Sequence, residues 1–456
     1  MCDFSLLSEA RDFNALEEII VRLVERLVIR FLGAYLRHLD TKLMRERPPG
    51  LRHVGVKTRR LTTRFGDITI LRRCYVEQES GRYRYLLDES LGLACRERFT
   101  RGLKARAVDE ASRQSFRRSA AALGGKASHS SVHNWTWQVG AAFRREVEHR
   151  RRQVFGLGRA VEGLARRVAA AFCEADGVVI RLQRAAGKVI EAKLAIIHEG
   201  WERLHPSSRE YRLKGKLVYA SLQGPSPFWE SLSVLAGRRW DLSAVKVIAG
   251  DGAEWVKQGV GYFPGAVYQL CRFHLARKIR ECLGGLGPAF GRVWAARSDP
   301  ERLIESATEA AARAADPEAK ERARELLGYL VANRDGLADY RTRVDIPGVE
   351  LRGLGAVESN IDKLVSARMR KRGMSWTVEG AANMLAVLTL RVNGWLDAAI
   401  DAVWGSSRTA EPTPRRPAAP RPGSQPGLMP IHMPALDRTR PVTKALRALT
   451  EVAWPF

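Results

Sequence analysis

A carboxylate, a thiol and an imidazole follow two apolar runs within one short stretch of the chain. The run 245–249 leads to Asp251, an acid between two glycines, and the run 266–270 leads to Cys271 and His274. A buried strand that stops at such an acid places it at the rim of a parallel sheet, and open α/β sheets bind ligands outside the carboxyl ends of their strands. The stretch therefore predicts a strand, a small helix, a strand and a basic helix, with reactive side chains at both strand ends.

Two more acids are candidates for the same site. Asp176 lies within an apolar segment with strand character, and Glu358 opens a helix with basic residues along it. Taken singly, an Asp at a strand end is more often a turn or capping residue, but the combination of Asp176 and Asp251 with Glu358 favours a functional set. Glu174 and Asp362 are the alternative acids on the same two elements.

Cys271 and His274 are three residues apart and share one helical face. A structural zinc needs two more ligands, and no second pair that includes a cysteine at ligand spacing occurs in the sequence, so such a zinc is not expected. A buried thiol beside a helix-capping histidine is the alternative to a catalytic role.

The elements around these residues predict a mixed sheet. Three strands, a helix, a strand, a short helix, a strand and a helix match the order of the ribonuclease-H-like fold. Asp176 is expected in the first strand and Asp251 at the end of the fourth. The strands are predicted at 171–182, 189–197, 216–222, 245–249 and 266–270, and the main helices at 228–238 and 381–395. Residues 283–345 are rich in Ala, Glu and Arg and predict a helical insertion, in which Asp-Pro pairs start helices at 301–315 and 317–333.

The N-terminal part predicts a long helix and a basic hairpin. Apolar residues at helical spacing span 14–39, and packing within its own domain is favoured over self-association for this helix. β-Branched residues on both sides of Gly66–Asp67 predict a hairpin within 56–88. Arg64 is among its basic side chains, so the hairpin either follows a DNA groove or is a solvated charged ribbon.

A helix-turn-helix is predicted next. A helix at 115–123, a glycine-containing turn and a second helix at 129–140, capped by Ser128, have this arrangement. The inward-facing residues are expected to be Val132, Trp135 and Val139, and the groove-facing residues His129, Ser130, Ser131, His133 and Asn134.

Composition and charge limit the class of protein. The chain has 456 residues, 45% of them hydrophobic, which suggests two to four domains with real cores. A net charge of +26 predicts a polyanionic partner, by default nucleic acid. No apolar run approaches the ~18–20 residues of a membrane span, and no secretory signal is visible. The six scattered cysteines fit a reducing compartment, so a cytoplasmic, nucleoid-associated protein is expected.

Several blocks of the sequence resemble bacterial insertion-sequence transposases with an Asp-Asp-Glu site, from a family beside the mutator-like branch. The blocks are CEADGVVI, VIAGDGAEW, QLCRFHLARKI and GAVESNIDKLVSARMRKRGMSW, with TRFGDITILRRCY and YLLDESLGL near the N-terminus. The resemblance implies a metal-dependent transposase with a ribonuclease-H-like catalytic domain and a helical insertion before the third acid. It also implies double-stranded DNA as partner, and synapsis of two DNA ends makes a homodimer or larger oligomer the expectation.

Each candidate residue has an expected role in that chemistry. Displacement at phosphorus can use two divalent ions roughly 3.5–4 Å apart, bound by oxygen ligands. Asp176 is assigned as the carboxylate that bridges two Mg²⁺ or Mn²⁺ ions, with Asp251 and Glu358 each completing one ion's shell. The resemblance places His274 near the scissile phosphate as a donor and Cys271 as the residue that positions it. The residues expected to contact DNA are Arg64, Ser130, His133, Asn134, Arg277, Lys278, Arg368, Arg370, Lys371, Arg372 and Trp376, of which Trp376 has a core role as the alternative to stacking on a base.

Two other functions remain open from the sequence. A non-catalytic DNA-binding protein would keep the helix-turn-helix and the charge, and a ribonuclease-H-fold nuclease would cut DNA without joining it. A nucleotide-driven motor is not expected because no GxxxxGK[ST] loop is present. The predicted segments are 1–50 (helix), 51–96 (basic β), 97–152 (helix-turn-helix), 165–282 and 346–402 (catalytic domain), 283–345 (insertion) and 403–456 (disordered basic tail).

Overall fold

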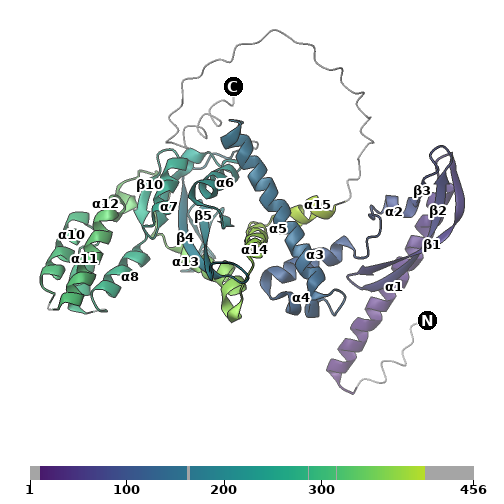
Figure 1. Ribbon diagram of the computed structural model, residues 1–456, viewed down its shortest axis with the longest axis horizontal. Coiled ribbons are helices and arrows are strands. Elements are labelled where there is room, and N and C mark those ends of the chain that lie inside the picture. The colour runs from purple at the N-terminus through teal and green to yellow at the C-terminus, as the bar shows by residue number, and fades with distance from the viewer. Residues whose placement is uncertain (1–10, 162–164, 286, 315, 406–456) are drawn as a thin grey trace, which may run out of the picture. The chain divides into compact units, whose positions relative to one another are not determined.

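The computed structural model describes residues 11–161, 165–285, 287–314 and 316–405 (Figure 1). Within these residues, 11–139 and 396–405 form an N-terminal unit and 140–395 form a C-terminal unit. Both units contain helices and strands, and the strands form separate sheets, so the architecture is multidomain and mixed α/β. The predicted disordered tail lies outside the described residues from position 406 onward.

A long helix and a three-stranded sheet form much of the N-terminal unit. The elements are α1 (Phe13–Arg45), β1 (Leu51–Thr63), β2 (Gly66–Glu77) and β3 (Tyr83–Arg84), in sheet order β1-β2-β3. Asp12 caps α1 by accepting a hydrogen bond from the N–H of Ala15. One apolar face of the helix packs against the hairpin, through Ile29, Leu32, Leu36, Leu39 and Leu43. The helix thus packs within its own unit, as the sequence favours.

The hairpin turn lies two residues earlier than predicted. Thr63 pairs with Gly66, so Arg64 and Phe65 form the loop and the predicted turn residues Gly66–Asp67 begin β2. The Thr63 hydroxyl donates to the Gly66 carbonyl and accepts from the Phe65 N–H, which closes the turn. Gly66 has φ +132°, a conformation that favours glycine. Glycine is therefore favoured at position 66, the first residue after the turn.

Helices complete this unit, and the predicted helix-turn-helix elements are present. The elements are α2 (Leu86–Ser90), α3 (Arg101–Arg113), α4 (Phe116–Ala122) and α15 (Leu396–Trp404), with α5 (His129–Arg151) belonging to this unit up to Val139. The Ser128 hydroxyl accepts a hydrogen bond from the Ser131 N–H at the start of α5. Val132, Trp135 and Val139 are buried, as predicted. The second helix is longer than predicted because 144–151 continues it.

A five-stranded sheet forms the centre of the C-terminal unit. Its strands are β4 (Ala171–Arg181), β5 (Val189–His198), β8 (Leu217–Ser221), β9 (Val245–Gly250) and β10 (Val267–Leu270), in the order β10-β9-β4-β5-β8. β5 is antiparallel to β4 and to β8, whereas β9 is parallel to β4 and to β10. All five predicted strands are present. The short hairpin β6 (Trp201–Arg203) and β7 (Tyr211–Leu213) was not predicted.

Helices pack on this sheet through large apolar side chains. α6 (Pro225–Gly237) buries Phe228 and Trp229 against the sheet core, together with Trp255 of α7 (Glu254–Lys257). The Trp229 indole N–H donates to the Trp255 carbonyl, which satisfies its polar atom inside the core. The remaining short elements are the 3₁₀ turns Leu242–Ala244 and Gln258–Tyr262 and the π-helical turn Arg152–Gly156.

The predicted helical insertion lies between β10 and the third acid. α8 (Arg272–Cys282) follows β10 directly and precedes the insertion. The insertion, predicted at 283–345, comprises α9 (Pro288–Ala295), α10 (Pro300–Ala312), α11 (Pro317–Ala332) and α12 (Arg334–Leu337), followed by a 3₁₀ turn, Tyr340–Thr342. In Figure 1 these helices gather beyond the β10 edge of the sheet. Asp299 and Asp316 cap α10 and α11, as the Asp-Pro pairs predict. Their carboxylates accept hydrogen bonds from the N–H groups of Glu301 and Ala319.

The helix that carries Glu358 is short and irregular. α13 (Ala356–Asn360) continues into a π-helical segment, η6 (Ile361–Arg370), and a 3₁₀ turn, Lys371–Gly373. α14 (Val378–Val392) follows and is largely buried. The sequence predicts a helix here but not its π-helical form.

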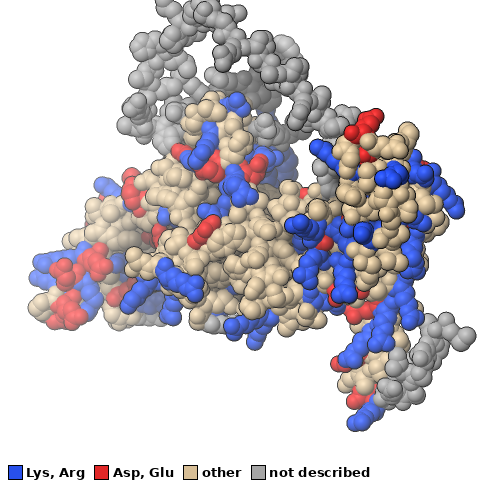
Figure 2. All heavy atoms as spheres, turned by 45° about the vertical axis from the view of Figure 1, so that its right-hand side comes forward, with Lys and Arg blue, Asp and Glu red and all other residues tan. Residues whose placement is uncertain are grey.

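Charge is spread over the surface. Lys and Arg side chains occur at many points of the face in Figure 2, with fewer Asp and Glu among them. None of the helices in the described ranges is both long and apolar enough to cross a membrane.

Candidate active site

Asp176 and Asp251 lie on neighbouring parallel strands. The register pairs Glu174 of β4 with Ala249 of β9, so the residues two positions further along, Asp176 and Asp251, come next to each other. Each carboxylate accepts a hydrogen bond from a backbone N–H one or two residues further on, at 2.7 and 2.9 Å. The sheet and these bonds place Asp176, in the middle of β4, beside Asp251, just after the end of β9. These are the two positions that the sequence predicts.

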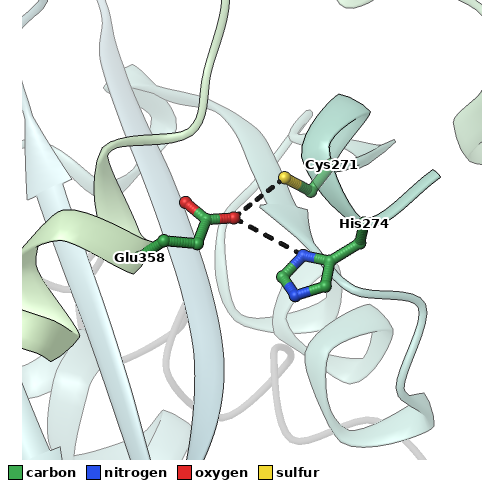
Figure 3. A group of neighbouring side chains, drawn as sticks. All are labelled: Cys271, His274 and Glu358. Atoms are coloured by element: carbon green, nitrogen blue, oxygen red, sulfur yellow. Dashed lines mark hydrogen bonds and ion pairs between the residues drawn. The ribbon is translucent and has the colours of Figure 1, made fainter. Parts of the chain in front are cut away.

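Cys271, His274 and Glu358 meet beside these acids. The Cys271 thiol donates to Glu358 Oε1 at 3.1 Å, and His274 Nδ1 lies 3.5 Å from the same oxygen. Figure 3 shows the three side chains pointing toward one another, two from the start of α8 and one from α13. The other ring nitrogen, His274 Nε2, lies 3.9 Å from Asp176 Oδ2. His274 therefore connects the first and third acids.

The charges of the three acids act on one another. Burial raises the pKa of Asp176 to about 6; His274 opposes this rise, and the charges of Asp251 and Glu358 add to it. Burial, followed by the charge of Glu358, raises the pKa of the Cys271 thiol well above its ordinary value. The thiol is therefore protonated and serves as the donor to Glu358.

The donor types fit a divalent cation. Glu358 Oε2 is buried and has no hydrogen-bond partner among the described residues, which is costly for an ionised oxygen. Asp176, Asp251 and Glu358 offer oxygens, the ligands of Mg²⁺ and Mn²⁺, and a cation would offset their mutual repulsion. In the part of the chain that the structure describes, however, the group with donor atoms all within 4.8 Å of one another is Cys271, His274 and Glu358.

Glu174 has a positioning role that the sequence does not reveal. Its side chain is 1% exposed, and its Oε2 accepts hydrogen bonds from the N–H groups of Gly355, Ala356 and Val357 at 2.8, 2.7 and 3.2 Å. These donors begin the helix that carries Glu358, so a carboxylate of β4 holds the third acid in place. Since three backbone donors already occupy this oxygen, the structure favours Asp176 over Glu174 as the ligand. An acid within an apolar strand was the only sequence signal for it.

The other alternative acid, Asp362, lies on the surface and pairs with Lys371. In contrast, the insertion contributes a residue that sequence reasoning missed. The Tyr329 hydroxyl of α11 donates to the Asp251 carbonyl at 2.8 Å. The adjacent Gly252 has φ +99°, and a side chain there would collide with the side chain of Asn333, the residue that follows α11. The insertion thus packs directly against the loop that carries the second acid.

A model of the uncharacterised protein family UPF0236 matches residues 6–404. The chain belongs to this family. A UPF0236 protein of Caldanaerobacter subterraneus subsp. tengcongensis is 25% identical over 399 residues, which cover 85% of this chain and 80% of the relative. Another UPF0236 protein of that strain, whose name joins eleven locus labels, is 24% identical over 399 residues, with the same shares. A Streptococcus gallolyticus relative, named as a UPF0236 protein in the vanSb 3′ region, is 23% identical over 405 residues, 85% of each chain.

Two residues expected to contact DNA are buried in this UPF0236 chain. Arg368 is 3% exposed, with its guanidinium 5.0 Å from the centre of the Trp376 ring. The Trp376 indole N–H donates to the Met369 carbonyl, so this side chain belongs to the core. The predicted phosphate contact of Arg368 and the predicted base stacking of Trp376 are therefore wrong. The core alternative holds for Trp376.

The remaining expected DNA contacts lie on the surface to different degrees. Arg64, Ser130, Asn134, Arg277, Arg370 and Lys371 are exposed, and the Arg372 side chain lies outside the described residues. His133 is half-buried between the rings of Phe116 and Trp137. Arg277 and Lys278 pair with Glu281 and Glu325. In the N-terminal hairpin of the family member, Arg59 and Arg72 pair with Asp88 and Arg73 with Asp40, so these three basic side chains serve the fold.

Proposed function

We propose that this chain is the DNA transposase of an insertion sequence. The observation that carries the proposal is the meeting of Asp176, Asp251 and Glu358 at one rim of the sheet, where the pKa of Asp176 responds to both other acids. The first and third of these residues are 182 positions apart (358 − 176). Three carboxylates from three elements, one within β4, one just after β9 and one on α13, favour metal-dependent chemistry over a structural role.

The sheet supports a ribonuclease-H-like catalytic domain. The order β10-β9-β4-β5-β8, with β4, β5 and β8 antiparallel and β9 and β10 parallel to β4, suits the strand succession that the sequence predicts for this fold. Asp176 is in its first strand and Asp251 follows its fourth. The proposed fold thus puts both acids at the edge where such sheets bind ligands.

The proposed reaction is cleavage and joining of DNA strands. Asp176, Asp251 and Glu358 would hold two Mg²⁺ or Mn²⁺ ions, which supply activation of the attacking oxygen and stabilisation of the leaving one. His274 would donate a hydrogen bond to the scissile phosphate. The Cys271 thiol orients Glu358 through its 3.1 Å hydrogen bond.

A property of one relative supports mobility of the gene. The name of a Caldanaerobacter protein 24% identical to this chain joins eleven locus labels from one strain. A gene that copies or moves itself is expected at many loci of one genome, whereas the gene of a host regulator is not. As part of the proposal, we infer that the gene of the present chain is mobile in the same way.

Charge and the N-terminal unit support DNA as the partner. The net charge of +26 favours a polyanion, and Ser130 and Asn134 lie exposed on the second helix of the helix-turn-helix. A transposase that binds two transposon ends together is expected to form a homodimer or larger assembly. It would act at the nucleoid, where its DNA substrate lies.

The test uses the DNA that flanks the gene as substrate, searched first for terminal inverted repeats. With Mg²⁺ or Mn²⁺, the protein is expected to nick these ends and join them to a target. Asp251→Asn should bind the ends but not nick them, and Asp362→Asn, a surface acid, should behave as wild type. Binding without nicking by the wild type would favour a non-catalytic DNA-binding protein, and nicking without joining would favour a nuclease.

A further inference from the structure

One thiol lies among the oxygen donors of the proposed catalytic centre. Cys271 and His274 come from the start of α8, and Glu358 comes from α13 (Figure 3). The sequence suggests only two zinc ligands at this position. The fold supplies a third, 84 residues after the histidine (358 − 274).

The spacing of the three donor atoms suits a single small ion. Zinc bonds of ~2.3 Å to sulfur and ~2.0–2.2 Å to nitrogen and oxygen place tetrahedral ligand atoms roughly 3.3–3.6 Å apart. The Cys271 Sγ to Glu358 Oε1 distance is 3.1 Å, and His274 Nδ1 is 3.5 Å from the same oxygen. All three donor atoms lie within 4.8 Å of one another, so side-chain shifts of about an ångström bring them around a single ion.

The surroundings also have the form of a metal site. His274 Nδ1 and Glu358 Oε2 are buried atoms with no hydrogen-bond partner within the described ranges. The other ring nitrogen of His274 faces Asp176 Oδ2 at 3.9 Å, and a carboxylate behind the second nitrogen is the usual support of a metal-bound histidine. The backbone is held as well, since the Cys271 N–H donates to the Gly250 carbonyl at 2.7 Å.

We propose that Cys271, His274 and Glu358 bind Zn²⁺, with Asp176 as the carboxylate behind the histidine and a fourth position open to water. Thiolate and imidazole ligands select Zn²⁺ over Mg²⁺, which takes oxygen ligands. The thiol proton leaves to solvent as the ion binds. Three protein ligands and one open position distinguish this site from a closed structural zinc site.

The consequence rests on the proposed function. Glu358 would serve both Zn²⁺ and the catalytic ions, and Asp176 would be drawn toward His274. Zinc and the catalytic ions therefore exclude each other, so that Zn²⁺ inhibits strand cleavage. Strand cleavage would then proceed only where free zinc is scarce.

The binding test uses the metal alone, without DNA. The full-length protein, freed of metal with a chelator, is titrated with Zn²⁺ against a chromophoric competitor, and with Co²⁺ to detect thiolate-to-metal charge-transfer absorption. One ion per chain is expected. Asp176→Asn, which removes the supporting carboxylate, should weaken Zn²⁺ binding by roughly 10–100-fold. Cys271→Ser, which removes a ligand, should weaken it by more than that. Cys95→Ser, which alters an exposed free thiol, is the matched control and should leave Zn²⁺ binding unchanged.

Equal Zn²⁺ affinity of wild type and Cys271→Ser, or a Co²⁺ complex without thiolate absorption, overturns the site. If Cys271→Ser fails to fold, Glu358→Gln takes its place and should weaken binding while keeping the thiolate band; unchanged affinity there also overturns the site. Cleavage assays separate the two proposals. Zinc binding through Cys271 without any Mg²⁺-dependent cleavage refutes the transposase but leaves the site. Cleavage that Zn²⁺ does not inhibit, by a protein that binds Zn²⁺ through Cys271, refutes the mutual exclusion of zinc and the catalytic ions and leaves the transposase.

Discussion

Replacing Asp176 by Asn is expected to stabilise the metal-free protein while it abolishes strand cleavage. Burial, then the charges of Asp251 and Glu358, raise the pKa of this carboxyl from 3.8 to about 6. A carboxyl with a raised pKa binds more protons in the folded state. Its stabilising contribution is thus fully present below the unfolded pKa and is lost as pH rises through the folded pKa. Above about pH 6, the ionised carboxylate opposes folding.

The size of the effect follows from the same two pKa values. The gap between the pKa values of 3.8 and about 6 corresponds to a loss of about 3 kcal/mol in the free energy of unfolding at neutral pH. Near pH ~5 the loss is about half as large. The Asp176 side chain is 13% exposed, so solvent screens it little. An Asn can still accept the hydrogen bond from the Gly177 N–H, and the substitution therefore removes mainly charge. We expect a gain of about 2–3 kcal/mol at about pH 7.5.

Denaturant unfolding measures this gain in the free energy of unfolding. Wild type, Asp176→Asn and the surface control Asp362→Asn are compared in a chelator at about pH 5 and about pH 7.5. The control should lie within about 0.5 kcal/mol of wild type at both values. Added Mg²⁺ should stabilise wild type more than Asp176→Asn, because only the wild type has the full ligand set. An Asp176→Asn protein that is less stable than wild type at pH ~7.5, or equally shifted at both pH values, would refute the reasoning.

Three further changes test separate parts of the structure. Glu174→Ala leaves three backbone N–H groups without an acceptor and should cost about 3 kcal/mol or more of unfolding free energy, with partial rescue by Glu174→Gln, as denaturation would show. Tyr329→Phe removes the hydrogen bond to the Asp251 carbonyl and should cost about 0.5–1.5 kcal/mol; it should also slow cleavage without weakening DNA binding in a gel-shift assay. Arg64→Ala should lower the slope of log affinity against log salt by about 1, whereas Arg368→Met, at a buried position, should leave that slope unchanged; equal slopes for Arg64→Ala and wild type would exclude a phosphate contact there.

Local sequence patterns predicted most of the elements that carry the candidate site. The five strands of the large sheet are apolar runs that end at turns. In the Asp-Pro pairs that start α10 and α11, the Asp carboxylates accept hydrogen bonds from backbone N–H groups two or three residues further along the chain. Asp176 and Asp251 could be proposed because each belongs to such a run. The role of Glu174 could not, because its three donors lie 181 to 183 residues further along the chain. Only the folded chain brings them together.

Arg368 was misjudged because it was grouped with its basic neighbours without regard to its helical face. Arg368 and Arg370 are two residues apart, which places them on nearly opposite faces of a helix, so both cannot face solvent when one face is buried. Their segment, Ile361–Arg370, is also π-helical, a rare form with hydrogen bonds to the fifth residue. Arg368 turns inward onto Trp376, while Arg370 stays exposed. Periodicity cannot reveal such a segment, since the residues themselves are ordinary helix formers.

The position of the third acid depends on β4 more than on the chain that leads to it. Glu174 and Asp176 belong to the same strand; the first holds the start of α13 through three hydrogen bonds, and the second lies next to His274, which contacts Glu358. The helices inserted before α13 can therefore vary in length at small cost, because the entropy of closing a loop grows only with the logarithm of its length. One constraint remains on the insertion, which is that α11 must still present Tyr329 to the Asp251 loop. A shorter insertion that keeps this contact should leave the site intact, whereas loss of Glu174 should displace Glu358 with the insertion unchanged.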